Sequence, residues 1–261
     1  MKAKKSLGQN FLIKPEIAEE IVKAAEVSDK DTIVEIGPGL GILTRALLNT
    51  GAKVYAIEKD FELVEMLRKA FGNNKNLKII HQDALFFDPS ILGDYKIVAN
   101  LPFNVGSPLI RKFLENQNQP KTMTVMLQKE VAEKIVAKPG SSERGILTLA
   151  VEYYAQAEIV IMVSKTSFRP QPKVDAAVIK IIPQRKFSIE AKSFFQIIKA
   201  GFSSKRRQIH NPLSATLHLD KNTVLEILQK SQIDPQLRAE DLSLGQWIKL
   251  HEIIKKGLGN I

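Results

Sequence analysis

The chain has 261 residues, which is enough for one full α/β domain and a small second domain. Its hydrophobic content of 44% and charged content of 25% are ordinary for a soluble globular protein, and its longest aliphatic runs are too short to span a bilayer. No membrane is therefore expected. The lack of cysteine excludes disulfides and thiolate chemistry, and the four histidines are too scattered for a metal cluster, so no metal is expected either. The basic first residues lack the apolar core of a secretion signal, which favours the cytoplasm.

The net charge of +10 favours an anionic partner. This charge is unevenly distributed, because residues 185–261 contain 13 Lys and Arg against 7 Asp and Glu, a net of +6 that leaves +4 for the longer remainder. The C-terminal part is therefore the basic part of the chain.

The chain opens with a segment, residues 4–12, in which Phe11 and Leu12 lie beside two amides and a glycine. Such a segment is either pinned across a site or packed on the domain as an arm. A helix over residues 15–25 follows, because a proline and an acid are both suited to a first helical turn.

A strand at residues 32–36 leads into glycines at alternate positions, Gly37, Gly39 and Gly41. Alternate glycines let the backbone turn sharply and let a ligand reach the amides without meeting a Cβ. A plain connecting turn and a dinucleotide-binding dehydrogenase are the alternatives. The spacing G-x-G-x-G behind Glu35 departs from the dehydrogenase pattern G-x-G-x-x-G.

Polar side chains follow three expected parallel strands at the point where each one ends. Glu58 follows the strand 53–57, Asp83 comes shortly after the strand 77–80, and Asn100 follows the strand 95–99. Parallel strands bind ligands at their carboxyl ends, and a doubly wound sheet places an acid such as Glu58 beside a ribose. The pattern therefore predicts a nucleoside pocket at this edge of the sheet.

The rest of the chain alternates between the two element types and then becomes helical. Helices are expected at 61–71, 108–116 and 129–137, strands at 122–127, 157–164 and 176–182, a mobile loop at 138–143, and further helices at 194–202, 205–211, 222–230 and 244–256. The last two strands are expected to pair antiparallel at one edge of the sheet. The pattern is α/β, with domains at residues 1–184 and 185–261.

The tetrapeptide Asn100-Leu101-Pro102-Phe103 carries groups that suit reaction at a nucleobase amine. Such an amine is a poor nucleophile because its lone pair is delocalised into the ring. The Asn100 oxygen and a backbone carbonyl held by Pro102 can accept hydrogen bonds from the amine, and Phe103 can stack on the base for about 1–3 kcal/mol. A proline turn with Phe103 in the core is the alternative.

Taken together, these motifs resemble the KsgA/Dim1 family of ribosomal RNA adenine dimethyltransferases. The resemblance covers nearly the whole chain, in order, at residues 4–12, 35–41, 58, 83–84, 100–103, 128–134, 168–178 and 205–207. It implies an α/β, Rossmann-like class I S-adenosylmethionine-dependent methyltransferase domain followed by a small all-helical RNA-binding domain. It also implies N6 dimethylation of two adjacent adenosines in a hairpin loop near the 3′ end of small-subunit (16S) rRNA, in the assembling 30S subunit, by a monomer.

The resemblance assigns roles to particular residues. Asn10 and Leu12 are expected to close over the donor, Gly37 to lie beneath its methionine part and Gly39 to contact it. Glu58 is expected to take the ribose hydroxyls and Asp83 the adenine amine. The tetrapeptide Asn100-Leu101-Pro102-Phe103 is expected to hold the target base, and Asn100 also to border the donor. The basic triplet Lys205, Arg206 and Arg207 is expected to open a helix and to hold the RNA backbone.

Two positions depart from the family pattern. Position 103 is Phe where Tyr is usual, and Gly106-Ser107 replaces Ser-Thr before Pro108. The macrolide-resistance methyltransferases of 23S rRNA share the fold and remain an alternative, although Leu101 and the run 173–175 favour the small-subunit enzymes. A non-catalytic RNA- or DNA-binding protein on the same scaffold is a further alternative.

Overall fold

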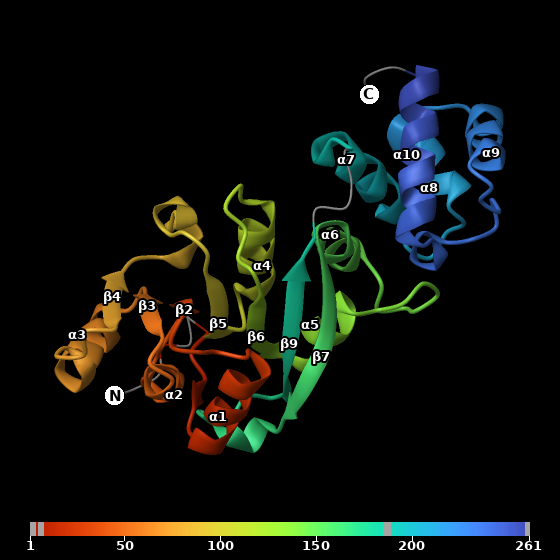
Figure 1. The fold of residues 1–261 in the computed structure, drawn as a ribbon. Coiled ribbons are helices and arrows are strands. Elements are labelled where there is room, and N and C mark those ends of the chain that lie inside the picture. Colours follow the sequence, from red (N-terminus) through yellow and green to blue (C-terminus); the bar gives the residue numbers. More distant parts are fainter. Residues whose placement is uncertain (1–3, 5–7, 185–188, 259–261) are drawn as a thin grey trace. The chain divides into compact units, whose positions relative to one another are not determined.

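The computed structural model describes residues 4, 8–184 and 189–258 (Figure 1). Contacts between Cα atoms divide the chain into two compact units. The first comprises Met1–Glu133 and Tyr154–Gln184, and the second comprises Lys134–Tyr153 and Arg185–Ile261. Residues 134–153 therefore group with the C-terminal helices. The division into domains at residue 184 stays a prediction.

The first unit is built on a seven-stranded sheet with the order β4-β3-β2-β5-β6-β9-β7 (Figure 1). The five strands from β4 to β6 are parallel, and β9 runs antiparallel to both β6 and β7, so the expected antiparallel pair at one edge is confirmed. The bounds are β2 Thr32–Ile36, β3 Lys53–Glu58, β4 Leu77–His81, β5 Lys96–Asn100, β6 Met123–Gln128, β7 Ala155–Val163 and β9 Ala176–Pro183.

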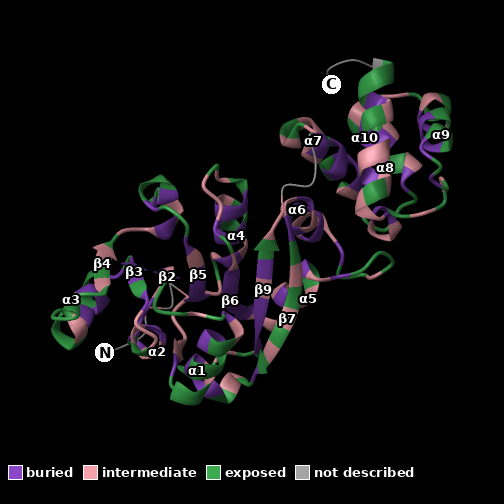
Figure 2. Ribbon diagram, viewed as in Figure 1, coloured by how far each residue is buried: buried purple, intermediate pink, exposed green. Residues whose placement is uncertain are grey.

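The central strands are buried along almost their whole length (Figure 2). Five of the six residues of β6 are buried, as a parallel strand covered on both faces requires. The helices and short 3-10 turns of this unit are α1 Pro15–Ala24, α2 Ile42–Asn49, α3 Phe61–Phe71, η2 Ala84–Phe86, η3 Pro89–Ile91, α4 Gly106–Glu115, α5 Lys129–Ile135 and η4 Lys165–Ser167.

A second, two-stranded sheet joins the N-terminal segment to the segment before β9. Strand β1 (Phe11–Leu12) runs antiparallel to β8 (Phe168–Arg169), and Leu12 pairs with Phe168. Both Leu12 and Phe168 are buried in the core cluster of this unit. Residues 8–12 are therefore held in place by backbone pairing and by apolar packing.

The second unit is helical. Its elements are α6 Ile146–Tyr154, α7 Ala191–Phe202, α8 His210–Leu217, α9 Lys221–Lys230, η5 Ala239–Asp241 and α10 Leu244–Leu258. The fully buried side chain of Arg144 joins two of its segments, because it pairs with Glu152 at 2.7 Å and also donates to the carbonyl oxygens of Ala137 (2.9 Å) and Leu242 (3.2 Å).

One helix was missed, and one expected helix begins later than predicted. Helix α6 was missed because its sequence is apolar on nearly all sides, so the spacing that identifies an amphipathic helix is absent. The helix expected at 205–211 begins only at His210, because Gln208 forms a bridge with Arg238 and the Ile209 amide donates to the Leu237 carbonyl. The triplet 205–207 lies in the turn before this helix, so the expectation that it opens a helix was wrong.

No helix in the described ranges is long and apolar enough to span a membrane.

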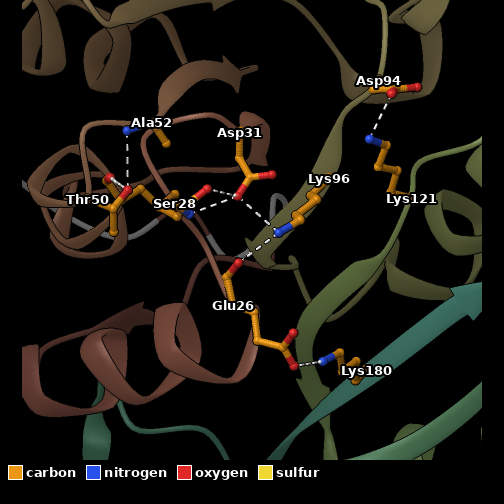
Figure 3. Close-up of polar contacts among 10 residues, drawn as sticks. Glu26, Ser28, Asp31, Thr50, Ala52, Asp94, Lys96, Lys121 and Lys180 are labelled. Atoms are coloured by element: carbon orange, nitrogen blue, oxygen red, sulfur yellow. Dashed lines mark hydrogen bonds and ion pairs between the residues drawn. The ribbon is translucent and has the colours of Figure 1, made fainter.

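Polar residues of the segment 26–31, which follows α1, bond to Lys96 of β5 and Lys180 of β9 (Figure 3). The Lys96 ammonium donates to the Glu26 carbonyl at 2.8 Å and pairs with Asp31 at 3.0 Å, and Asp31 also accepts from the Ser28 amide at 2.8 Å. Lys180 pairs with the Glu26 carboxylate at 2.6 Å. Burial raises the pKa of Asp31, but the bonds from Ser28 and Lys96 outweigh it, and the net direction is downward.

Replacing Asp31 by Asn should lower the free energy of unfolding at pH 7 by about 1–3 kcal/mol, because hydrogen bonds to a charged group are lost. A carboxylate whose pKa is lowered on folding stabilises the fold when the pH is above its pKa in the unfolded chain. This stabilisation is lost as the pH falls through its pKa in the folded protein, so the difference in stability between Asp31→Asn and wild type should vanish in acid. Urea unfolding from pH 3 to pH 7 measures this. Asp94→Asn is the matched control, since Asp94 is 79% exposed in its pair with Lys121 and should change stability by less than about 0.5 kcal/mol. Equal effects of the two variants would contradict the assignment.

Candidate active site

The carboxyl ends of β2, β3 and β5 open into one cavity in the first unit. All ten residues expected in the donor and target-base sites line it, namely Asn10, Leu12, Gly37, Gly39, Glu58, Asp83, Asn100, Leu101, Pro102 and Phe103. The triplet 205–207 belongs to the second unit and is not part of this cavity.

The glycine loop after β2 needs glycine for two physical reasons. Gly37, Gly39 and Gly41 have φ angles of 67°, 57° and 81°, a region that L side chains rarely adopt. A Cβ on Gly39 would lie 3.0 Å from the Phe11 ring, and one on Gly41 would lie 2.6 Å from the Phe71 ring. The loop is therefore packed against the Phe11 and Phe71 rings, and its residues 37–40 line the cavity.

Glu58 ends β3 and is 7% exposed. One carboxylate oxygen accepts from the Asp60 amide at 2.9 Å, and the other accepts from the Gly39 amide at 3.3 Å. Burial raises the pKa of Glu58 above its usual range, although these amides oppose the rise. The carboxylate is held in one orientation at the cavity wall, and each oxygen has a further lone pair that can accept from a ligand hydroxyl.

Asp83 follows β4 and caps the 3-10 turn η2. One oxygen accepts from the Leu85 amide at 3.0 Å, and the other pairs with the Lys59 ammonium at 2.8 Å. The Lys59 bond is the largest cause that holds the pKa of Asp83 below its usual range. Asp83 is therefore an ionised, fixed acceptor.

Asn100 ends β5 and supplies a buried acceptor to the cavity. Its side-chain nitrogen lies 3.5 Å from the Asn10 carbonyl, whereas its side-chain oxygen is buried and has no hydrogen-bond partner in the described part of the chain. Buried polar groups are nearly always paired, and an orphaned one calls for a ligand or a functional role. The Leu101 amide donates to the Met126 carbonyl at 3.0 Å, which fixes the backbone that follows.

Phe103 is half-buried. Its ring meets the Phe168 ring edge-on, with centroids 6.1 Å apart, and it packs against the core cluster while also lining the cavity. A ring held in this way can present one face to a planar ligand without moving.

The sequence matches the family model described as Ribosomal RNA adenine dimethylase over residues 1–256. A Dehalococcoides mccartyi protein named Ribosomal RNA small subunit methyltransferase A is 41% identical over 257 residues, which cover 96% of this chain and 88% of that protein. The chain belongs to the ribosomal RNA adenine dimethylase family. A Clostridium botulinum protein with the same name is 40% identical, covering 97% of this chain and 94% of that one.

Solved structures extend the similarity to the fold. A dimethyladenosine transferase from Plasmodium falciparum superposes with a TM-score of 0.82 at 26% identity, covering 94% of this chain and 98% of that one. The 23S rRNA methyltransferase ErmE superposes with a TM-score of 0.74 at 24% identity, covering 94% of this chain and 100% of that one, and shows the fold alone. The expected class I methyltransferase fold with C-terminal helices is confirmed for this member of the dimethylase family.

In this dimethylase-family chain the N-terminal segment is also tied to the start of α3. The Lys4 ammonium pairs with Asp60 at 2.8 Å and with Glu62 at 3.2 Å, and the Gln9 side chain donates to Asp60 at 3.0 Å. Asp60 itself caps α3. These contacts hold residues 8–12, which include Asn10 and Leu12, along the cavity wall.

Glu35 lines the cavity, but the sequence analysis assigns it no role. Glu35 lies in β2 just before the glycine loop, is 1% exposed, and has no hydrogen-bond partner for either carboxylate oxygen among the described residues. Burial raises the pKa of Glu35 to about 8, and the neighbouring Thr44 opposes part of this rise. The sequence signal that could have identified Glu35 is a single acid among the aliphatic residues of a strand.

Glu35→Gln should make the protein without ligand more stable at pH 8. The folded state retains a proton on Glu35 up to about pH 8, whereas the unfolded chain loses it near 4.5, so stability falls as the pH rises between these values. Glutamine removes this titration, and each pKa unit is worth about 1.4 kcal/mol. The gain over wild type should be several kcal/mol at pH 8 and should disappear towards pH 4.5.

Urea unfolding from pH 5 to pH 8 measures the difference. Glu65→Gln is the control, because Glu65 is a surface acid paired with Arg68 and should show no such trend. A constant difference between Glu35→Gln and wild type over this range would show that Glu35 is ionised in the folded protein.

Proposed function

We propose that this chain transfers methyl groups from S-adenosylmethionine to the N6 amines of two adjacent adenosines, in a hairpin loop near the 3′ end of small-subunit (16S) rRNA. The observation that carries the proposal is the buried, unpaired Asn100 oxygen at the wall of a cavity built for a nucleoside. The 40–41% identity to proteins named Ribosomal RNA small subunit methyltransferase A supports the choice of acceptor.

The residues at the cavity suit the donor. Glu58 takes the two ribose hydroxyls through the free lone pairs of its fixed carboxylate, and Asp83 accepts from the adenine amine. The glycine loop lines the cavity with Gly37 and Gly39, where the methionine part would lie, and its left-handed turns are open only to glycine. Asn10 and Leu12 cover the donor from the N-terminal segment. When bound, the donor supplies an electrophilic methyl group on a sulfonium.

The target base requires positioning more than it requires a base catalyst. The Asn100 oxygen and the Leu101 carbonyl, which Pro102 holds in an extended backbone, accept the two hydrogens of the adenine amine, and this turns its lone pair out of the ring. Phe103 stacks on the base and fixes its plane. The nitrogen becomes cationic as it gains the methyl group, so its proton then leaves to water without a strong base. Geometry and the two acceptors account for the rate.

The proposal extends to the setting of the reaction. The acceptor is the assembling 30S subunit, and the protein acts as a monomer in the cytoplasm. A 23S rRNA methyltransferase is the second candidate, because the ErmE fold is similar. Leu101 and the run 173–175 favour the small-subunit reaction, and the intact set of Glu58, Asp83 and Asn100 speaks against a protein that only binds nucleic acid.

Replacing Glu58 by Ala should weaken S-adenosylmethionine binding at least about 100-fold, because two charge-assisted hydrogen bonds are lost at about 1.5–3 kcal/mol each. Glu58→Gln keeps the size of the side chain and loses its charge, so its affinity for S-adenosylmethionine should lie between those of Glu58→Ala and wild type. Titration calorimetry measures both. Glu65→Ala, on the exposed side of α3, is the control and should bind as wild type does. Wild-type affinity in Glu58→Ala would remove Glu58 from the donor site.

Asn100→Ala should lower the methylation rate at least about 100-fold while rRNA affinity changes little, because its hydrogen bond strengthens as the amine becomes tetrahedral. Single-turnover methylation and filter binding on the same small subunits separate the two effects.

Phe103→Tyr keeps the stacking surface and should remain active, whereas Phe103→Ala should lose both rate and base capture. An inactive Phe103→Tyr with intact circular dichroism would contradict the role given to the ring in the base pocket.

A further inference from the structure

The short turn that carries Asp83 lies at one edge of the main sheet. This Asp83 turn comprises residues 83–87, in which Asp83 caps the 3-10 turn η2, and it follows β4, the strand at that edge. Within η2 only Ala84 is buried, and Phe86 is 78% exposed. Asp83 and Ala84 nevertheless line the cavity, so the place of the Asp83 carboxylate depends on what holds this turn.

Lys112 holds the Asp83 turn from α4. Its ammonium donates to the Ala84 carbonyl at 3.0 Å and also to the Phe87 carbonyl. The side chain is half-buried, and burial lowers the pKa of Lys112, while the charges of Asp88 and Asp83 oppose this shift. A half-buried ammonium needs acceptors within the protein, and two carbonyls of one turn supply them here.

Lys59 holds the same turn from the end of β3. Its ammonium lies 2.8 Å from one Asp83 oxygen, and the other oxygen accepts from the Leu85 amide. Lys59 is also the one cation among the described residues that line the cavity. A cation beside a positively charged donor is unfavourable unless it serves another purpose, and the pair with Asp83 supplies that purpose.

The two lysines come from elements that form other parts of the cavity. Lys59 directly follows Glu58, the residue assigned to the ribose. Helix α4 begins shortly after the tetrapeptide 100–103, and its residue Leu109, one helical turn before Lys112, lines the cavity. The Asp83 turn is thereby tied to the strand that carries Glu58 and to the helix that follows the tetrapeptide.

We propose that Lys59 and Lys112 are positioning residues that hold Asp83 so that the cavity accepts a donor whose purine carries an exocyclic amine and rejects one whose purine carries an exocyclic oxygen. The inference rests on the proposed donor and adds the residues that determine its nucleobase specificity. An ionised carboxylate only accepts hydrogen bonds, so it bonds to the amine of adenine and repels the oxygen of hypoxanthine. A carboxylate fixed at both oxygens cannot turn away from the wrong base, whereas one on a loose turn can.

A purely structural role for the two lysines predicts a different result. Loss of a structural contact would weaken the binding of adenine and hypoxanthine compounds alike, because it lowers the fraction of protein that is competent to bind either. Loss of a positioning contact lowers the preference for adenine. The ratio of the two affinities therefore separates the two roles.

The probes are S-adenosylhomocysteine and S-inosylhomocysteine, which carry adenine and hypoxanthine on the same ribose and homocysteine. Titration calorimetry measures the dissociation constant of each compound, and circular dichroism checks the fold of each variant. Wild type should prefer the adenosyl compound at least about 50-fold, because hypoxanthine leaves the Asp83 carboxylate facing another acceptor.

Lys59→Met and Lys112→Met keep the aliphatic stem and remove the ammonium, and each should lower this preference at least about fivefold. Lys59→Arg can still pair with Asp83 and should keep the wild-type preference. Lys112→Gln retains a group that donates to one carbonyl. It replaces Lys112→Met if that variant does not fold, and it should give an intermediate preference.

The chain offers a matched control for each position. Lys121→Met removes an ion-paired lysine that is 59% exposed, against 60% for Lys59, and Lys180→Met removes a half-buried lysine. Neither control residue lines the cavity. Both controls should keep the wild-type preference, and a loss in them equal to that in the test variants would reduce the effect to net charge and overturn the inference.

The remaining outcomes separate this inference from the proposed function. A wild-type preference in either methionine variant, even with weaker binding of both compounds, would overturn the joint positioning role and leave the methyltransferase proposal intact. Equal binding of the two compounds by wild type would also overturn the inference, because Asp83 would then not select the base. If wild type binds neither compound, the proposed donor falls and the inference falls with it.

Discussion

The glycine loop holds its shape because two of its amides donate to the end of β3. The Gly37 amide bonds to the Ile57 carbonyl at 2.9 Å and the Gly39 amide to the Glu58 carboxylate at 3.3 Å. The rest of the site depends on this constraint, since the parallel register that pairs Ile36 with Ile57 brings the loop and the acid together. The same sheet then sets Asn100, at the end of β5, beside them.

The cavity contains buried oxygens that make no hydrogen bond within the described protein. Both oxygens of Glu35 and the side-chain oxygen of Asn100 belong to this class. A buried acceptor left unpaired costs about 1–3 kcal/mol, so a protein selected for stability alone would fill these positions differently. Their place at the wall of the cavity fits a site that is completed by its ligands, with stability given up for function.

Local patterns predicted the sheet and its binding edge because strands and the residues at their ends are encoded within about six neighbouring positions. The strand-end residues Glu58, Asp83 and Asn100 line one pocket for that reason, whereas Asn10 and Leu12 were expected only from the family resemblance. Long-range contacts could not be foreseen in the same way. The pairing of β1 with β8, the bridge from Gln208 to Arg238 and the partners of Lys205 join segments far apart in sequence. An all-apolar helix such as α6 also lacks the periodicity that local reasoning needs.

The most direct measurement is to map the modified nucleotides after incubating the protein and S-adenosylmethionine with small ribosomal subunits that lack the modification. Primer extension, supported by mass spectrometry of the digested rRNA, locates each methyl group. The account predicts two adjacent N6,N6-dimethyladenosines in the hairpin loop near the 3′ end of 16S rRNA, and none with Asn100→Ala. Methylation of 23S rRNA, or no methylation by a protein that binds the donor normally, would contradict it.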